Sequence, residues 1–387
     1  MKLTGYRRKD GSVGIRNHIL VLPTVVCANE VARAVAEKVP GAVAVNHQHG
    51  CAQLGVDADQ TKRTLAGLGS NPNVAAVIVV GLGCETVLAP SVARVIESSR
   101  PGMPMKHLVI QDLGGTDNAI EVGIQSGMEM YQIVSQYKRE PIEFGELTIS
   151  LECGGSDVTS GIASNPAVGA VSDMLVKKGS TVILSETSEL IGAEHILAER
   201  AVNEKVKARL LAVVKGMEQK ALQMGVSITG GNPSPGNIEG GLTTIEEKSL
   251  GCVYKGGTSP VMEVIEYAEA PTQKGLVVMD TPGHDIESMT GMAAGGSQIC
   301  LFTTGRGTPM GSPVMPVIKI CGNPITSKKM SCNIDINIGT IIEGHETLDK
   351  AAERIMKEIV EVINGKSTAA EQRRMFGFAI NRIGPTM

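Results

Sequence analysis

Residues 151–166 read LECGGSDVTSGIASNP, and they form the most informative junction in the chain. The apolar run at 147–151 predicts a strand that ends in CGGSD at 153–157, and Pro166 marks the start of a helix. Glycines let the backbone approach a ligand closely. The point where a parallel strand hands over to a helix N-terminus is where α/β proteins bind anions. The stretch therefore predicts an α/β fold with a ligand site here, against the alternative of a tight turn that carries a Ser and an Asp.

The same design recurs three times nearer the N-terminus. Apolar runs lead into PTVVC at 23–27, HQHGC at 47–51 and GLGCE at 81–85, and each of these loops carries a cysteine. This recurrence favours a functional interpretation. Cys27, Cys51, Cys84 and Cys153 are expected to gather at one edge of the sheet and could hold iron. Their long spacings match no iron–sulfur signature, and the alternative is that most of them serve as small buried hydrophobes.

The first part of the chain alternates short apolar runs with helical patterns. Runs that are almost wholly apolar indicate strands buried on both faces, as in a parallel sheet. The expected strands are 19–22, 43–46, 75–80 and 107–110, and the expected helices are 28–38, 57–68, 88–98 and 119–136. This order predicts a Rossmann-like, doubly wound parallel-sheet unit over residues 1–140.

A polar link at 138–146 leads to a second α/β domain, predicted over residues 147–387. Its expected strands are 147–151, 181–185, 275–279, 298–303 and 314–320, and its expected helices are 167–178, 193–224 and 348–363. The loop at 229–241 is rich in Gly, Pro and Asn. Long loops in compact domains are usually functional, so we expect Gly/Pro-rich active-site loops in this domain.

Composition excludes several classes of function. Aromatic residues make up 2% of the chain and the net charge is −4, which argues against binding to nucleic acid. No apolar stretch is long enough to span a membrane, and the N-terminus lacks the apolar segment of a signal peptide. Eight cysteines without a CxxC pair indicate reduced thiols. We therefore expect a cytoplasmic protein without a nucleic-acid or membrane partner.

Two carboxylates and a histidine follow predicted strands. Glu186 and Glu189 come directly after the strand at 181–185, a position that suits metal ligation or proton transfer. The alternative is that they sit in the first turn of a helix, near its positive dipole end. His47 lies beside Cys51 and suits a metal role, with a buried, hydrogen-bonded histidine as the alternative.

Cationic side chains stand in two Gly-rich blocks. Lys248 follows Glu247 after the loop that contains Asn237, and partial desolvation would let it act as a base. Arg306 lies between glycines two residues after Thr304, where a guanidinium can clamp a carboxylate. The glycines remove side chains that would block a substrate.

With these blocks in view, the chain resembles the large catalytic portion of the altronate/galactarate dehydratase family over nearly its whole length. The matching blocks are VGIRN at 13–17, PTV at 23–25 with Cys27, His47 with GC at 50–51, GLGCE at 81–85, CGGSD at 153–157, SG at 160–161, Glu186, Glu189, NPSPGN at 232–237, EK at 247–248 and TGRGTP at 304–309. His49 departs from the family pattern, where a tyrosine stands.

The resemblance implies a lyase that carries out β-elimination on a small 2-hydroxy carboxylic acid and yields a 2-keto acid. A base removes the C2 proton, and cations and a metal stabilise the resulting enediolate. The family implies a divalent metal, most often Fe²⁺, with Mn²⁺ or Mg²⁺ as alternatives. From the chemistry we assign Lys248 as base and Glu247 as its orienter or the acid. The expected substrate-binding residues are Ser156, Asp157, Asn237, Thr304 and Arg306, and the expected metal ligands are His47, Glu186 and Glu189.

The chain departs from the sugar-acid dehydratases at its start, where they usually carry a small antifreeze-like (SAF) domain. The family also has split members, such as (2R)-3-sulfolactate sulfo-lyase, whose larger subunit releases sulfite. We therefore expect a separate small SAF-domain subunit and an oligomeric enzyme, with sulfo-lyase activity as the alternative to sugar-acid dehydration. A Rossmann-type oxidoreductase is a third alternative, but PTVV at 23–26 stands where GxGxxG is required.

Overall fold

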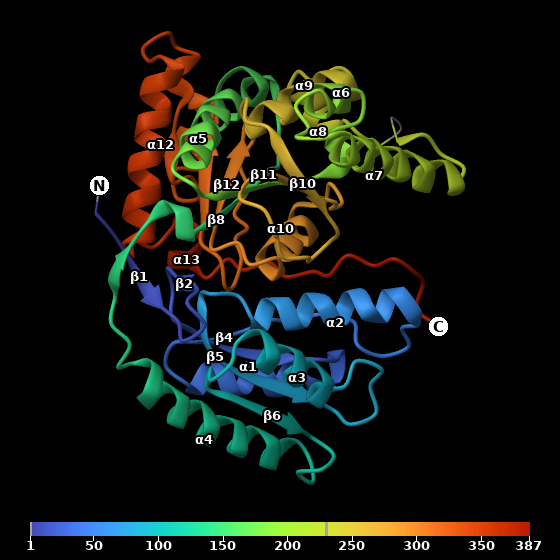
Figure 1. Cartoon of the computed structure of the whole chain (residues 1–387), viewed down its shortest axis with the longest axis vertical. Helices are drawn as coiled ribbons and strands as arrows, with labels where there is room; N and C mark the ends of the chain where they lie inside the picture. Colours follow the sequence, from blue (N-terminus) through green and yellow to red (C-terminus); the bar gives the residue numbers. More distant parts are fainter. Residues whose placement is uncertain (1, 229–230) are drawn as a thin grey trace.

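The computed structural model describes residues 2–228 and 231–387, so the first two residues of the predicted loop at 229–241 lie outside the described residues. Two parallel sheets are stacked in the molecule, the first in the lower half of Figure 1 and the second in the upper half. Helices pack on both faces of each sheet. The predicted α/β class is confirmed.

The first sheet has four parallel strands in the order β4-β3-β5-β6. Their bounds are β3 (His18–Pro23), β4 (Ala42–Ala44), β5 (Val74–Gly81) and β6 (Met105–Val109). Four helices cover it: α1 (Asn29–Lys38), α2 (Gly55–Gly69), α3 (Ala89–Ser99) and α4 (Thr116–Val134). Every residue of β5 is buried, as its unbroken apolar sequence predicts.

The second sheet has seven parallel strands in the order β10-β11-β9-β8-β12-β13-β14. The bounds are β8 (Thr148–Cys153), β9 (Thr181–Leu184), β10 (Val261–Ile265), β11 (Gly275–Met279), β12 (Ile299–Thr304), β13 (Val317–Cys321) and β14 (Ile336–Asn337). The chain leaves β8 toward one edge and later returns to place β12 on the other side of β8. Loops diverge at such a switch point, and ligands bind there.

The helices of the second sheet divide between its two faces. One face packs against α5 (Asn165–Lys177) and α12 (Leu348–Ile363). The other face packs against α10 (Asp285–Ala294), which contacts α2 of the first unit. Leu22 and Val79 of the first sheet therefore share one core with Val277 and Phe302 of the second. The remaining helices are α6 (Glu194–Ala198), α7 (Glu204–Gln223), α8 (Pro235–Glu239), α9 (Ile245–Val253), α11 (Pro324–Lys329) and α13 (Ala369–Arg373).

Two of the differences from the sequence prediction concern the long helix and the polar link. A single helix over 193–224 is wrong, because the chain breaks between α6 and α7. Asn203 caps α7 by accepting a hydrogen bond from the Val206 amide at 3.0 Å. The predicted polar link contributes β7 (Glu140–Ile142) to a small antiparallel sheet with β1 (Leu3–Arg7) and β2 (Val13–Gly14). These strands are short, and β1 and β7 are partly exposed, so no apolar run predicts them.

The C-terminal tail crosses back over the first unit. The Met387 amide donates to the Ala52 carbonyl at 3.1 Å, and Arg382 pairs with Asp57 at 2.7 Å. Figure 1 shows this segment running along α2 to the C-terminus. The tail and the shared core together tie the two units to one another.

Candidate active site

A cavity of about 910 Å³ opens at the carboxyl end of the second sheet. The loops after β8, β9, β11 and β12 line it, and α7, α8 and α9 close its outer side. It therefore lies at the switch point between β8 and β12. The CGGSD junction that ends β8 forms part of its floor, as the sequence predicted for a ligand site.

The two glycines of this junction make room for the site. A Cβ atom on Gly154 would lie 2.1 Å from the Asp285 carboxylate and 2.7 Å from the Phe302 ring. Gly155 has a φ of 59°, which side chains disfavour. Any larger residue at 154 would displace Asp285 from the cavity wall.

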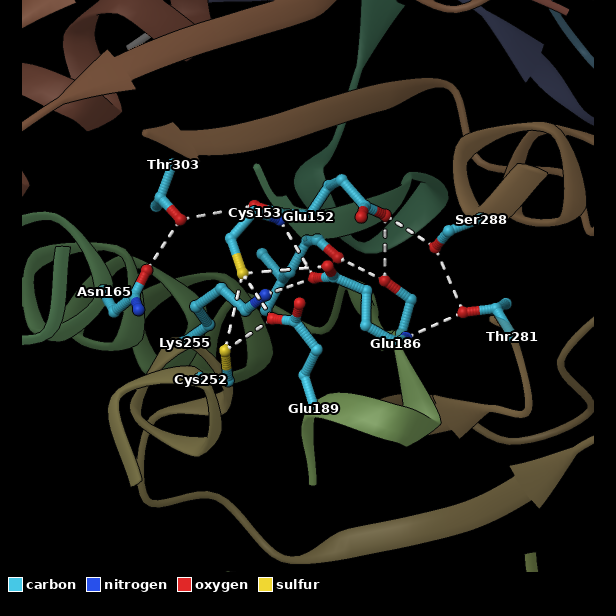
Figure 2. A network of polar contacts seen from close by, with 12 residues as sticks. Glu152, Cys153, Asn165, Glu186, Glu189, Cys252, Lys255, Thr281, Ser288 and Thr303 are labelled. Atoms are coloured by element: carbon cyan, nitrogen blue, oxygen red, sulfur yellow. Dashed lines mark hydrogen bonds and ion pairs between the residues drawn. The ribbon is translucent and has the colours of Figure 1, made fainter. Parts of the chain in front are cut away.

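A fully buried ion pair lies under the cavity (Figure 2). The Lys255 Nζ is 2.5 Å from a carboxylate oxygen of Glu186, and the same oxygen accepts a hydrogen bond from the Cys153 amide at 2.9 Å. Burial raises the pKa of Glu186, although Lys255 opposes this shift. Burial alone would lower the pKa of Lys255, but Cys153 and Glu186 raise it well above its ordinary value. Glu186 also has a φ of 67°, and strained backbone of this kind concentrates at functional sites.

Glu189 uses its two carboxylate oxygens differently. One oxygen lies 2.6 Å from the Lys248 Nζ, which also donates to the Asn232 side chain at 2.8 Å. The other accepts from the thiols of Cys252 at 2.9 Å and Cys153 at 3.2 Å, and the two sulfurs are 3.5 Å apart. Burial alone would raise the pKa of Glu189, but Lys248 and Lys255 lower it. Burial would lower the pKa of Lys248, but Glu189 raises it. Lys248 is therefore a cation at neutral pH.

Asp285 is the carboxyl group best suited to exchange protons. It opens α10 and lines the cavity. Burial and the nearby Glu186 and Glu189 raise its pKa to about 7. Glu152, below it, is fully buried and accepts from Ser288 at 2.6 Å, while its other oxygen has no partner among the described residues. Burial, together with the nearby Glu186 and Asp285 carboxylates, raises the pKa of Glu152 well above its ordinary value.

Several residues predicted from the sequence do meet in this cavity. Ser156, Asn237 and Lys248 line it together with Glu189 and Arg306. Asn237 donates its side-chain amide to the Ser156 carbonyl at 2.9 Å, which ties α8 to the CGGSD junction. Arg306 is partly exposed at the cavity wall and pairs with Glu239 at 2.8 Å. Glu186 does not line the cavity but lies beneath it, where it pairs with Lys255.

Three other predicted residues hold loops instead of lining this cavity. The Asp157 carboxylate accepts from the Thr159 amide at 2.9 Å and from the Asn323 side chain at 2.9 Å. Thr304 is buried and accepts from the Gly307 amide at 2.8 Å. Glu247 accepts from the Thr243 amide at 2.7 Å at the start of α9 and makes no ion pair with Lys248 among the described residues.

His47 belongs to the other sheet. Its ring Nε2 lies 2.8 Å from the Pro23 carbonyl, and it lines a separate cavity of about 340 Å³ in the first unit. Burial lowers its pKa to about 4. The structure therefore does not assemble the expected ligand set of His47, Glu186 and Glu189. The sequence places His47 in the unit predicted over 1–140 and both glutamates in the domain predicted over 147–387, but it does not show whether the two units bring their strand ends to one site.

Sequence reasoning missed Glu152, Cys252, Lys255 and Asp285. Lys255 and Cys252 stand in the stretch LGCVYKGG at 250–257, which has no carboxylate to suggest an ion pair. Asp285 had a usable signal, because the stretch TPGHD at 281–285 follows a strand and precedes a helix. Cys153 lies beside Cys252 at this site, in the second sheet. The expectation that Cys153 shares one sheet edge with Cys27, Cys51 and Cys84 is therefore wrong.

Fold and site together define an α/β enzyme with buried lysine–carboxylate pairs at a sheet switch point. The chain belongs to the galactarate/altronate dehydratase family. The family model described as D-galactarate/Altronate dehydratase, C-terminal, matches residues 144–386. A second model, D-galactarate dehydratase/Altronate hydrolase, second domain, matches residues 5–135.

Named relatives support the same assignment. A protein named (2R)-sulfolactate sulfo-lyase subunit beta from Chromohalobacter salexigens is 39% identical, with 98% of this chain and 97% of the relative covered. Altronate dehydratase from Escherichia coli is 37% identical over 99% of this chain and 78% of the relative. Galactarate dehydratase (L-threo-forming) from Escherichia coli is 36% identical over 94% and 72%. These relatives are dehydratases and a sulfo-lyase, and the chain is a lyase. Its described helices include none long and apolar enough to cross a bilayer.

Proposed function

We propose that the chain is a sugar-acid dehydratase that removes water from a small 2,3-dihydroxy carboxylic acid and yields a 2-keto acid. One observation carries this proposal: a carboxyl group with a pKa of about 7, Asp285, shares a cavity with the cationic Lys248. A hydroxyl group leaves poorly without a proton donor, and a carboxyl group that titrates near neutral pH both accepts and donates a proton.

The steps follow from these groups. The ionised Asp285 takes the proton from C2 of the substrate, and the pair of electrons moves into the carboxylate to form an enediolate. Lys248 and the partly exposed Arg306 supply positive charge beside that anion. Asp285 then returns the proton to the C3 hydroxyl, which leaves as water. The resulting enol becomes the 2-keto acid. In this proposal Lys248 acts as a cation, because its raised pKa makes it a poor base.

The donor set of the site suits the proposed Fe²⁺. Among the described residues, Cys153, Glu189 and Cys252 offer ligand atoms that lie within 4.8 Å of one another. Two sulfurs and one oxygen favour a borderline metal over Mg²⁺ or Mn²⁺. A second set, of Glu152, Glu186 and Asp285, offers only oxygens, which Mg²⁺ or Mn²⁺ would prefer. Each set includes a glutamate that pairs with a lysine, Glu189 with Lys248 and Glu186 with Lys255. When bound, Fe²⁺ would act as a Lewis acid toward the substrate oxygens.

A separate small subunit completes the proposal. The relative named sulfo-lyase subunit beta is matched over 97% of its length, and its name implies a further subunit. Exposed apolar side chains lie on neighbouring segments beside the cavity, where α8, α9 and the loop after β8 meet. They are Val158, Ile162, Ile238, Leu250 and Tyr254. We propose that the small SAF-domain subunit covers them.

Sulfo-lyase activity is the second candidate, and the 97% coverage of that relative favours it. Sulfite leaves without a proton, so this reaction needs Asp285 only as a base. A panel of sugar acids and 3-sulfolactate, assayed for 2-keto acid and for free sulfite, separates the two. We expect 2-keto acid from a sugar acid. Turnover of 3-sulfolactate alone would overturn the dehydratase proposal, and turnover of neither, with the small subunit and Fe²⁺ present, would overturn both.

A further inference from the structure

The first sheet has a switch point of its own, and the active-site cavity does not use it. The chain moves from β3 outward to β4 and then returns to place β5 on the other side of β3. Ligands of open α/β sheets bind beyond the carboxyl ends of the strands at such a point. The loops that leave β3, β4 and β5 there carry Cys27, Cys51 and Cys84.

Direct contacts hold these three loops together. The Val26 amide donates to the His49 carbonyl at 3.1 Å, and the Val87 amide donates to the Gly50 carbonyl at 3.0 Å. Thr24 donates its hydroxyl to Glu85 at 3.2 Å. Each cysteine is therefore within two or three residues of a contact to a neighbouring loop. Gly50 has a φ of 98°, and a Cβ on it would lie 2.0 Å from the Thr24 carbonyl, so the loop before Cys51 is pressed against the loop before Cys27.

The three thiols are available for a ligand. All three side chains are exposed, and only one other cysteine of the chain, Cys332, is exposed as well. In the described part of the chain, none of the three donates or accepts a hydrogen bond. Three of the four exposed thiols therefore stand on one edge of one sheet, although their sequence spacings are irregular.

The chemistry of the edge favours an anionic ligand bound through sulfur. Cys27, Cys51 and Cys84 each precede a helix of ten or more residues, namely α1, α2 and α3. The N-termini of these helices carry partial positive charge, which favours a negatively charged group bound beside them. The one acid in the loops, Glu85, is already satisfied by Thr24 and by the Gly83 amide at 2.6 Å.

Three thiols can bind either a single metal ion or a metal–sulfide cluster. A single tetrahedral ion with metal–sulfur bonds of about 2.3 Å needs sulfurs roughly 3.8 Å apart. Among the described residues, the groups of three donors within 4.8 Å of one another do not include these thiols. A cluster that brings its own irons and sulfides spans wider separations. We propose that Cys27, Cys51 and Cys84 bind a four-iron, four-sulfide cluster, with a non-protein ligand on the fourth iron.

Cluster binding needs only an exchange of ligands. Each cysteine thiol gives up its proton, its sulfur bonds to one iron, and a thiolate of the donor complex leaves with that proton. No electron is transferred. None of the three cysteines lines the active-site cavity, so the proposal stands or falls separately from the proposed function.

The test uses the purified full chain without oxygen and a preformed four-iron, four-sulfide complex with small thiolate ligands. We expect about four irons and about four acid-labile sulfides per chain after desalting, with broad visible absorbance. The triple variant Cys27→Ser, Cys51→Ser, Cys84→Ser should retain none, whereas Cys332→Ser, the matched exposed control, should retain all. The variant sites are exposed, and circular dichroism checks that the triple variant is folded.

Alkylation provides a readout that needs no variant. Before cluster transfer, mass spectrometry should find Cys27, Cys51, Cys84 and Cys332 alkylated by iodoacetamide. After transfer, Cys332 alone should react. Iron without sulfide, unchanged alkylation of the three cysteines, or full cluster content in the triple variant would each overturn the proposal.

Discussion

At the scale of single residues, the protonation states of Lys248 and Asp285 determine how the site works. The sequence suggested that Lys248 is the base, since a partly desolvated lysine has a low pKa. In the folded chain its ammonium group instead lies 2.6 Å from Glu189, which raises its pKa. In the proposed mechanism, proton transfer falls to Asp285, whose burial beside two glutamates raises its pKa to about 7.

Lys248→Met should lower kcat by about 10²–10³, the usual effect of losing one preorganised charge beside a developing anion. Lys248→Arg keeps the charge and should retain more of the activity than the methionine variant. Steady-state kinetics with the preferred substrate compares the two. If the arginine variant is as inactive as the methionine variant while both remain folded, Lys248 acts as a base and the cation role is refuted.

Asp285→Asn should lower kcat by about 10²–10⁴, the typical contribution of a general acid or base. The wild-type kcat/KM should rise with pH up to about 7, because the C2 proton is taken by the ionised carboxylate and its pKa is about 7. A pH profile of kcat/KM measures this rise. If kcat/KM of Asp285→Asn rises with pH in the same way, the rise belongs to another titrating group.

At the scale of elements, the site depends on segments that come together from far apart in the sequence. Cys153 ends β8, Glu189 follows β9, and Cys252 lies in α9. Three donors reach one point only because β8 and β9 are neighbours in the sheet and α9 packs over their ends.

Removal of metal tests whether these three donors bind an ion that the reaction needs. A chelator should abolish turnover, and Fe²⁺ should restore it better than Mg²⁺, because two of the three donors are sulfurs. Cys252→Ser should bind less iron than wild type when iron is measured without added sulfide, so that no cluster forms elsewhere. Full activity in a preparation shown to hold no metal would rule out the metal proposal.

Strand β13 carries a buried lysine whose effect should be visible in stability. The Lys319 side chain is fully buried, and its Nζ has no hydrogen-bond partner among the described residues. Burial lowers its pKa from 10.5 to about 8. Between these values the unfolded chain holds a proton that the folded chain has released, so the free energy of unfolding from this group rises with pH from about 8 to 10.5.

At pH 7 both states are protonated, and the full penalty of the buried charge remains. Lys319→Met should therefore raise the free energy of unfolding at pH 7 by up to about 3 kcal/mol, at roughly 1.4 kcal/mol per pKa unit. Urea denaturation at pH 7 and pH 10 measures it, and the gain should shrink at the higher pH. A variant less stable than wild type at pH 7 would show that the ammonium group is favourably solvated.

At the scale of the whole molecule, the two sheets form one body. A shared core joins Leu22 and Val79 to Val277 and Phe302, and the C-terminal tail adds an ion pair between Arg382 and Asp57. The active-site cavity nevertheless opens to solvent beside exposed apolar side chains, including Ile162 and Ile238.

We expect the isolated chain to be poorly active, because water weakens the electrostatic stabilisation of the enediolate in an open site. Adding a separate small subunit of roughly one hundred residues should raise kcat strongly. Ile162→Asp should weaken its binding, whereas Val202→Asp, at an exposed apolar residue outside this group, should not. Full turnover by the isolated chain, with no small protein bound to it in its native host, would contradict the prediction.

The sequence alone determined the local structure and the family. Apolar runs buried on both faces predicted the strands of the first sheet and most of the second, because burial of both faces demands such runs. It missed the short strands β1, β2, β7 and β14 as well as β10 and α10, and it joined α6 to α7. The lyase chemistry followed from the resemblance of the Gly-bounded polar blocks to those of the altronate/galactarate dehydratase family.

Only the tertiary structure decided which strand ends share a site. Every parallel strand presents a similar loop at its carboxyl end, and the units predicted over 1–140 and 147–387 could have met at these ends, so the sequence cannot tell whether His47, in the first sheet, reaches Glu189, in the second. The tertiary structure also decided the protonation state of Lys248. The pKa of Lys248 depends on burial and on the Glu189 carboxylate brought to it by folding, and these electrostatic effects act through space, irrespective of separation along the chain.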